Sequence, residues 1–181
     1  MTGDEGTTVA ILSKLPPPFK KGGTTTAGNS SQISDGAAAI VLARRSFAQK
    51  HKLPILGRIV SFAVAGVPPQ TMGVGPTYAI PLALEKCGLK LSDIDIFELN
   101  EAFASQATYC ANKLGIDRKK LNPNGGAIAL GHLLGMTGTR MVGTLLRELK
   151  RTQKRFGVAS MCIGTGMGAA AVFEREDGSQ L

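Results

Sequence analysis

Residues 156–173 read FGVASMCIGTGMGAAAVF, and no other run in the chain says as much about its architecture. Two apolar segments, Phe156 to Cys162 and Ala169 to Phe173, flank a glycine-rich turn at residues 164–168. Short apolar runs bounded by glycine are typical of buried strands, and so short a connection favours antiparallel pairing. The stretch therefore predicts a β-hairpin in the core of a sheet.

The chain before this hairpin alternates between strand-like and helix-like patterns. Working back from it, we expect a helix over residues 137–149 with Thr137 as its cap, a glycine loop over 124–138, a helix over 103–114, a strand over 91–99, a helix over 76–87 and a strand over 55–67. Residues 37–43 favour a buried strand leading into a short helix over 44–52, although periodicity alone leaves helix as an alternative for the alanine run. This order predicts an α/β fold with a central sheet and helices on its faces.

The length and the punctuation of the chain indicate one domain. At 181 residues the chain falls in the range of a single α/β unit. Prolines, glycines and hydroxyl residues crowd the first 34 positions, which we interpret as a linker or loop segment. We expect the domain itself over residues 35–176 and a tail over 177–181.

Composition excludes several classes of protein. The net charge of +8 favours an anionic partner, but few aromatic residues lie among the basic clusters, which argues against nucleic-acid binding. Three cysteines without paired spacing argue against a zinc site or a disulfide framework and favour a reducing compartment, and we expect no metal. No apolar run approaches the length of a membrane span, and no targeting segment is visible.

Three polar residues stand at predicted element ends, where α/β folds place ligands. Asn100 follows the strand at 91–99, His132 follows Gly131 in the glycine loop, and Cys162 ends the first strand of the hairpin. Each has a structural interpretation when taken alone. Asn100 is suited to cap the next helix, His132 to be a satisfied loop histidine, and Cys162 to be a small buried apolar residue.

Taken in order, the motifs NEAF at 100–103, GH at 131–132 and CIG at 162–164 resemble those of the thiolase family. Further segments support the resemblance, namely TAGNSS at 26–31, DGAA at 35–38, GVGP at 73–76, NGGA at 124–127 and residues 161–168. It covers about residues 10 to 175 and is strongest to the C-terminal half of peroxisomal 3-ketoacyl-CoA thiolases. The resemblance implies a βαβαβαββ arrangement with a mixed five-stranded sheet covered by helices.

The resemblance implies an acyltransferase that acts on acyl-CoA, with CoA as a substrate and no permanently bound cofactor. His132 is implied to activate a cysteine nucleophile and to help hold the thioester oxyanion, and Cys162 to be the acid/base. A thiol suits that role because its pKa can be lowered into the working range. Asn100 is implied to position a water in one oxyanion hole, and the Gly164 N–H to contribute to a second.

Ser31 and Phe103 match family positions that line the pantetheine tunnel. Two departures lie beside His132, where the family usually has proline at the position of Leu133 and a small residue or cysteine at that of Met136. A freer backbone and a long side chain at these positions put catalytic competence in doubt.

The family's nucleophilic cysteine belongs to the N-terminal half, and neither Cys87 nor Cys110 has a matching context. We therefore expect this chain to be inactive alone and to pair with a thiolase N-terminal half or a homodimer partner. The resemblance also implies fatty-acid β-oxidation in the peroxisome. The alternative is a non-catalytic interaction or dimerisation protein that keeps the scaffold. Ketosynthases share the fold but use a second histidine where this chain has Cys162, which favours thiolase.

Overall fold

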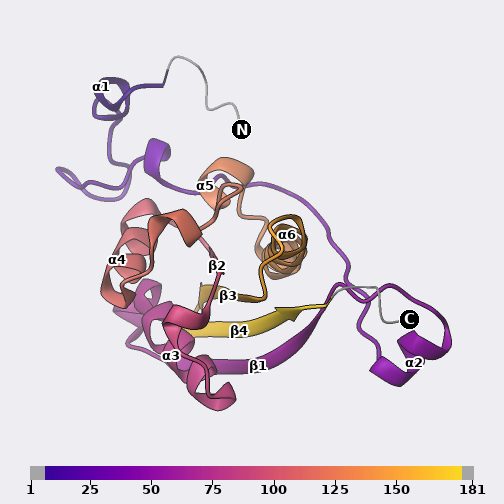
Figure 1. Cartoon of the computed structure of the whole chain (residues 1–181). Helices are drawn as coiled ribbons and strands as arrows, with labels where there is room; N and C mark the ends of the chain where they lie inside the picture. The colour runs from indigo at the N-terminus through magenta and orange to yellow at the C-terminus, as the bar shows by residue number, and fades with distance from the viewer. Residues whose placement is uncertain (1–6, 177–181) are drawn as a thin grey trace.

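A mixed β-sheet organises the computed structural model, which describes residues 7–176. Within these residues the sheet has four strands in the order β1-β4-β3-β2. They are β1 (Gly57–Gly66), β2 (Ile96–Leu99), β3 (Phe156–Ile163) and β4 (Met167–Arg175). Figure 1 shows the sheet with helices on either side. The α/β class is confirmed, with one strand fewer than expected.

The hairpin predicted from residues 156–173 forms the centre of the sheet. β3 and β4 pair antiparallel from Phe156 opposite Glu174 to Ile163 opposite Met167, and β1 adds antiparallel to β4. β2 lies parallel to β3, with Leu99 opposite Ser160. Because β2 and β3 are parallel, their carboxyl ends meet at the same edge of the sheet.

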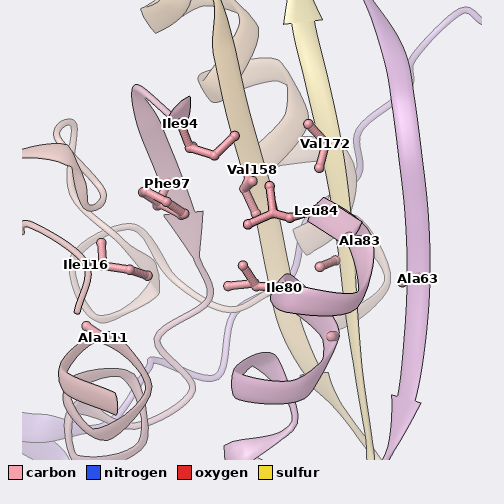
Figure 2. Packing of buried hydrophobic residues seen from close by; sticks show 12 residues of the cluster. Ala63, Ile80, Ala83, Leu84, Ile94, Phe97, Ala111, Ile116, Val158 and Val172 are labelled. Atoms are coloured by element: carbon pink, nitrogen blue, oxygen red, sulfur yellow. The ribbon is translucent and has the colours of Figure 1, made fainter. Parts of the chain in front are cut away.

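Helices cover both faces of this sheet. α3 (Pro76–Cys87) and α4 (Ala104–Leu114) pack on one face, and α6 (Thr137–Arg151) packs on the other. α3 begins with Pro76 and ends at Gly88, whose φ of 69° is the left-handed conformation that terminates helices. The predicted bounds of α3 are thus confirmed. Figure 2 shows Ile80 and Leu84 of α3 beside Phe97 of β2 and Val158 of β3.

Two glycines bring α3 against the end of the hairpin. Gly75, the residue before α3, lies so close to Gly168 of β4 that a Cβ added at position 168 would stand 2.6 Å from the Gly75 Cα. A Cβ on Gly75 would likewise stand 2.6 Å from the Gly168 Cα. Only glycine allows backbones to approach so closely, which explains part of the glycine excess in this chain.

The remaining helices are short. They are α1 (Val9–Leu12), α2 (Arg45–Lys50) and α5 (Ala127–Leu130), with 3₁₀ turns η1 (Ala27–Asn29), η2 (Pro69–Val74), η3 (Leu91–Asp93), η4 (Arg118–Lys120) and η5 (Leu134–Met136). α5 and η5 lie within residues 124–138, which we expected to be loop throughout. Gly126 precedes α5 and Gly131 follows it at a φ of 95°, so two of the glycines limit a single turn of helix.

The strand predicted over residues 37–43 is wrong. These residues form no strand and are exposed, with Val41 at 88% and Leu42 at 76%. An apolar strand needs a neighbour for its backbone groups, and within residues 7–176 no other strand lies beside this segment. The short helix expected after it is present as α2.

Three other expectations concern the ends of the chain and its setting. The segment at residues 1–34 carries α1 and η1 where it is described, and the tail expected at 177–181 lies outside the described residues. Among residues 7–176, no helix combines the length and the apolar character needed to cross a bilayer.

Candidate active site

Asn100 and Cys162 lie at the same edge of the sheet. Asn100 directly follows β2, and its backbone N–H donates to the Ser160 carbonyl of β3 at 2.9 Å. Cys162 stands two residues further along β3. The parallel pairing of β2 and β3 therefore places both residues at the carboxyl ends of neighbouring strands, where α/β folds bind ligands.

The Asn100 side chain contacts His132 rather than capping a helix. Its Nδ2 lies 3.3 Å from His132 Nε2, and Phe103, not Asn100, is the N-cap of α4. The interpretation of Asn100 as a cap is therefore wrong. On the other side of the ring, His132 Nδ1 lies 2.8 Å from Thr137 Oγ1. The imidazole is thus held at both nitrogens, between the end of β2 and the start of α6.

These two contacts fix the proton arrangement of the neutral imidazole. An amide nitrogen can only donate, so His132 Nε2 accepts from Asn100 and carries a lone pair. The neutral ring then carries its proton on Nδ1, which donates to Thr137 Oγ1. Thr137 was expected to cap α6, but Met136 is the residue before that helix and the Thr137 hydroxyl serves His132 instead.

The Asn100 carboxamide keeps a free acceptor in the site. Asn100 is 1% exposed, and its Oδ1 has no hydrogen-bond partner among the described residues. A buried carbonyl oxygen without a partner is suited to accept from a water or from a ligand hydrogen. This geometry fits a residue that positions a water beside His132.

A second asparagine holds the turn that carries Asn100. Asn122 Oδ1 accepts from the Leu99 N–H at 2.9 Å, and Asn122 Nδ2 lies 2.9 Å from the Leu99 carbonyl and 3.0 Å from Glu101 Oε1. Glu101 in turn accepts from the Ile128 N–H at 3.2 Å. The turn after β2 is therefore tied to the glycine loop that carries His132. Sequence reasoning missed Asn122, for which the NPN run at 122–124 was the available signal.

Burial changes the proton affinity of both titratable candidates. The pKa of His132 is lowered, first by burial and then by the positive charge of Arg140. The pKa of the Cys162 thiol is raised by burial. The pKa of a thiol can be lowered into the working range, but at Cys162 burial outweighs the opposing backbone hydrogen bond. Cys162 is thus a protonated thiol at neutral pH, and His132 is a neutral imidazole.

The segment at residues 30–34 forms one wall of this site. The Ser31 N–H donates to the Ala102 carbonyl at 3.0 Å, and Ser30 forms a β-bridge with Phe103. Ile33 forms a second bridge with His132. The structure therefore brings Ser31 beside Phe103, which is 37% exposed. A segment that we interpreted as a linker or loop contributes directly to the surroundings of the site.

Gly164 lies at the rim of the site, as do Leu133 and Met136, the two residues that depart from the family pattern. Gly164 is exposed, and a Cβ built on it would meet no atom within 4 Å, so a ligand has open access to its backbone. Leu133 and Met136 both turn toward Gly36, where the Met136 sulfur would lie 2.9 Å from an added Cβ. The Met136 side chain thus packs on the segment after residue 34.

The other cysteines are packing residues, as expected. Cys110 is fully buried on α4 with its Sγ 3.4 Å from the Gly73 carbonyl, and burial raises its pKa to about 11. The Cys87 thiol bonds to carbonyls of its own helix α3. Within residues 7–176 there is no group of three histidine, cysteine, aspartate or glutamate side chains suited to a metal ion.

Comparison with known families places most of the chain in two matches to one family. The family model described as "Thiolase, C-terminal domain" matches residues 53–175, and "Thiolase, N-terminal domain" matches residues 2–46. The exposed apolar segment at 37–43 lies in the second match.

Individual relatives are similar over nearly the whole chain. The human peroxisomal 3-ketoacyl-CoA thiolase is 67% identical over 179 residues, which cover 96% of this chain and 42% of that protein. The Saccharomyces cerevisiae counterpart is 62% identical over 178 residues, with the same coverage. This chain therefore spans about 42% of the length of the curated relatives that it matches.

Solved structures of thiolases have the same fold. The human mitochondrial 3-ketoacyl-CoA thiolase in complex with CoA superposes with a TM-score of 0.92 at 47% identity, covering 95% of this chain and 44% of that one. The dimeric peroxisomal thiolase of Saccharomyces cerevisiae superposes with a TM-score of 0.88 at 61% identity, covering 94% and 43%. On its sequence and its fold, this chain is a member of the thiolase family.

Proposed function

We propose that this chain supplies the acid/base part of a 3-ketoacyl-CoA thiolase site, which transfers an acyl group between a cysteine thiolate and CoA. The observation that carries the proposal is the imidazole of His132, held at both nitrogens with a lone pair on Nε2. Nε2 is the unprotonated nitrogen of this ring, and it takes a proton in exchange for the Asn100 N–H that it accepts in this structure. The nucleophile is a cysteine from a thiolase N-terminal half.

His132 activates that nucleophile. Nε2 takes the proton of the cysteine thiol, and the resulting thiolate attacks the C3 carbonyl of the 3-ketoacyl-CoA. The new Nε2–H then donates to the oxyanion that forms, and a water held by Asn100 Oδ1 provides a second donor. A lowered pKa suits His132 because a ring already protonated at rest cannot act as the base.

Cys162 serves the other half of the reaction. When the C2–C3 bond breaks, its electron pair stays on C2 of the departing acetyl-CoA, and the Cys162 thiol protonates that carbon. The Cys162 thiolate then takes the proton of an incoming CoA thiol, whose sulfur attacks the acyl-enzyme. The nucleophilic cysteine leaves as a thiolate that regains the proton held on His132 Nε2, and acyl-CoA is released. The raised pKa of Cys162 supports this role because the thiol must hold its proton until the carbanion forms.

The exposed backbone of Gly164 and the pair Ser31–Phe103 complete the proposed site. The Gly164 N–H donates to the thioester oxygen of the departing acetyl-CoA, which carries negative charge while C2 is a carbanion. Ser31 and Phe103, which lie beside one another, line the path of the pantetheine arm.

From the similarity to peroxisomal thiolases we also propose fatty-acid β-oxidation as the pathway and the peroxisome as the compartment. The interaction partner is either a thiolase N-terminal half or a dimer partner.

A reconstitution assay tests the proposal. This chain is assayed alone, mixed with the N-terminal half of a peroxisomal thiolase, and fused to that half, with 3-ketoacyl-CoA and CoA supplied. Thiolysis is expected in the mixture or the fusion, and its loss in His132→Ala and Cys162→Ala. A folded fusion that yields no acetyl-CoA, or that is unaffected by both substitutions, would contradict the proposal.

A further inference from the structure

A buried ion pair lies one layer below the proposed site. Glu98 of β2 is 1% exposed, and its Oε2 accepts from Arg140 Nη1 of α6 at 3.0 Å. Glu98 stands two residues before Asn100 on the strand, and Arg140 stands three residues after Thr137 on the helix. Side chains two apart on a strand, and three apart on a helix, share a face.

Alternation along β2 supports this two-layer arrangement. Ile96 packs in the cluster that α6 covers, while Phe97 and Leu99 pack in the clusters on the opposite face. Glu98 and Asn100 therefore share the face of Ile96, toward α6. The Glu98–Arg140 pair is therefore on the same face of β2 as Asn100 and on the same face of α6 as Thr137, the two residues that hold the His132 ring.

The Glu98–Arg140 ion pair leaves some of its hydrogen-bonding atoms without partners among the described residues. It has one hydrogen bond, while Glu98 Oε1 and Arg140 Nε are buried without partners within residues 7–176. Burial raises the pKa of Glu98 to about 7, Arg140 lowers it, and the charges of Glu101 and Glu148 raise it further. The carboxyl is therefore about half protonated at neutral pH and largely protonated at lower pH, where the positive charge of Arg140 is left uncancelled.

The other charged groups near His132 are already engaged. Glu101 accepts from Asn122 and Ile128, and Glu148 is held by Arg151 and Asn124. Residues 32–34, which run beside His132, have no titratable side chain, and Cys162 on β3 is protonated at neutral pH. Among these charged groups it is Arg140 whose charge, after burial, lowers the pKa of His132.

We infer that Arg140 is a positioning residue for His132: held in place by Glu98, its buried charge beneath the imidazole keeps the ring neutral and able to accept a proton. The inference rests on the proposed function of His132 as the base, but the arrangement can be tested without catalysis. Glu98 holds the Arg140 guanidinium in position through one hydrogen bond, and when its carboxyl is protonated it does not offset the positive charge of Arg140.

The chain has two histidines, His51 and His132, which makes the test direct. The pH titration of both rings is followed by NMR in wild type, Arg140→Gln, Arg140→Lys and Glu98→Gln, with exposed His51 as the internal reference. We expect Arg140→Gln to raise the His132 midpoint by roughly half a unit to one unit, the lower range for a neighbouring charge. Arg140→Lys keeps the charge and should return the midpoint close to wild type.

Glu98→Gln separates this inference from a structural role. The amide resembles the protonated carboxyl, so the His132 midpoint should stay at or below the wild-type value. Loosened packing would instead expose the ring and raise the midpoint in every variant. An unchanged midpoint in Arg140→Gln, or equal increases in Arg140→Gln and Glu98→Gln, would overturn the inference. Thiolysis by the fusion protein is measured separately, so loss of the proposed function and loss of this inference give different results.

Discussion

Replacing Thr137 with valine should release the His132 ring from its present tautomer. Valine keeps the shape of threonine but removes the hydroxyl, which lies 2.8 Å from His132 Nδ1. Thr137 is 1% exposed, so no bulk water replaces that hydroxyl from the Thr137 side. The Nδ1–H then loses its acceptor while Asn100 still holds Nε2.

The magnitude follows from the burial of the two partners. Leaving a buried donor unsatisfied costs about 1–3 kcal/mol. Because His132 itself is only partly buried, water can reach the ring from the site, and we expect the lower end of this range, about 1 kcal/mol. That corresponds to a roughly fivefold change in the ratio of the two neutral tautomers. The free energy of unfolding should fall by a similar amount.

The assay is ¹⁵N NMR of the ring nitrogens, whose chemical shifts distinguish a protonated nitrogen from one with a lone pair. Thr137→Ser is the matched control, because it keeps the hydroxyl and loses a methyl group. The valine variant should show a decrease in Nδ1–H, and the serine variant should match wild type. Identical tautomer ratios in wild type and Thr137→Val would refute the assignment of the proton to Nδ1.

Three further predictions concern the framework and the thiols. Gly168→Ala forces a Cβ to within 2.6 Å of the Gly75 backbone. It should lower the unfolding free energy, measured by urea denaturation, by about 3 kcal/mol or more. Gly66→Ala, which lies on the same pair of strands with open space around it, should change that free energy little. Asn122→Ala removes the contacts to Leu99 and Glu101 and should cost about 2 kcal/mol by the same assay, while Asn112→Ala on the exposed side of α4 should cost well under 1 kcal/mol; equal losses would contradict the role given to Asn122. Because the Cys162 pKa is raised, its thiolate fraction should still increase above about pH 8.5, the ordinary midpoint of a thiol. The rate of iodoacetamide labelling at Cys162, measured by mass spectrometry, should therefore continue to rise beyond that pH. A rate that levels off earlier would be inconsistent with a protonated thiol at rest.

The sequence predicts the elements of this fold well where local signals agree with the tertiary structure. α3 has proline at its start and glycine at its end, and the hairpin has a glycine turn between apolar strands, so both follow from the sequence alone. The segment at 37–43 has the composition of a buried strand, but composition does not provide a partner strand. Pairing is a non-local property, which is why this prediction failed.

The candidate site was predictable to the extent that it depends on motifs at strand ends. Asn100, His132 and Cys162 were found in that way, whereas their partners were not. Thr137 has the side chain of a helix cap, and nothing in its local sequence distinguishes a hydroxyl that caps α6 from one that binds His132. The direction of the Cys162 pKa shift likewise does not follow from the sequence, because it depends on how much of the thiol the fold buries.

Glu98 was the clearest available signal that the sequence analysis passed over. A carboxylate between Phe97 and Leu99, in a strand buried on both faces, has to be paired or to serve a purpose. The fold pairs it incompletely, and a structural ion pair alone gives no reason to leave buried atoms of both partners unsatisfied. The raised pKa of Glu98 does have a consequence for His132, because the carboxyl loses its charge below neutral pH and leaves the positive charge of Arg140 near a base that must stay unprotonated. β2, the strand that places Asn100 at the site, therefore also places Glu98, whose protonation determines how much of the Arg140 charge acts on His132.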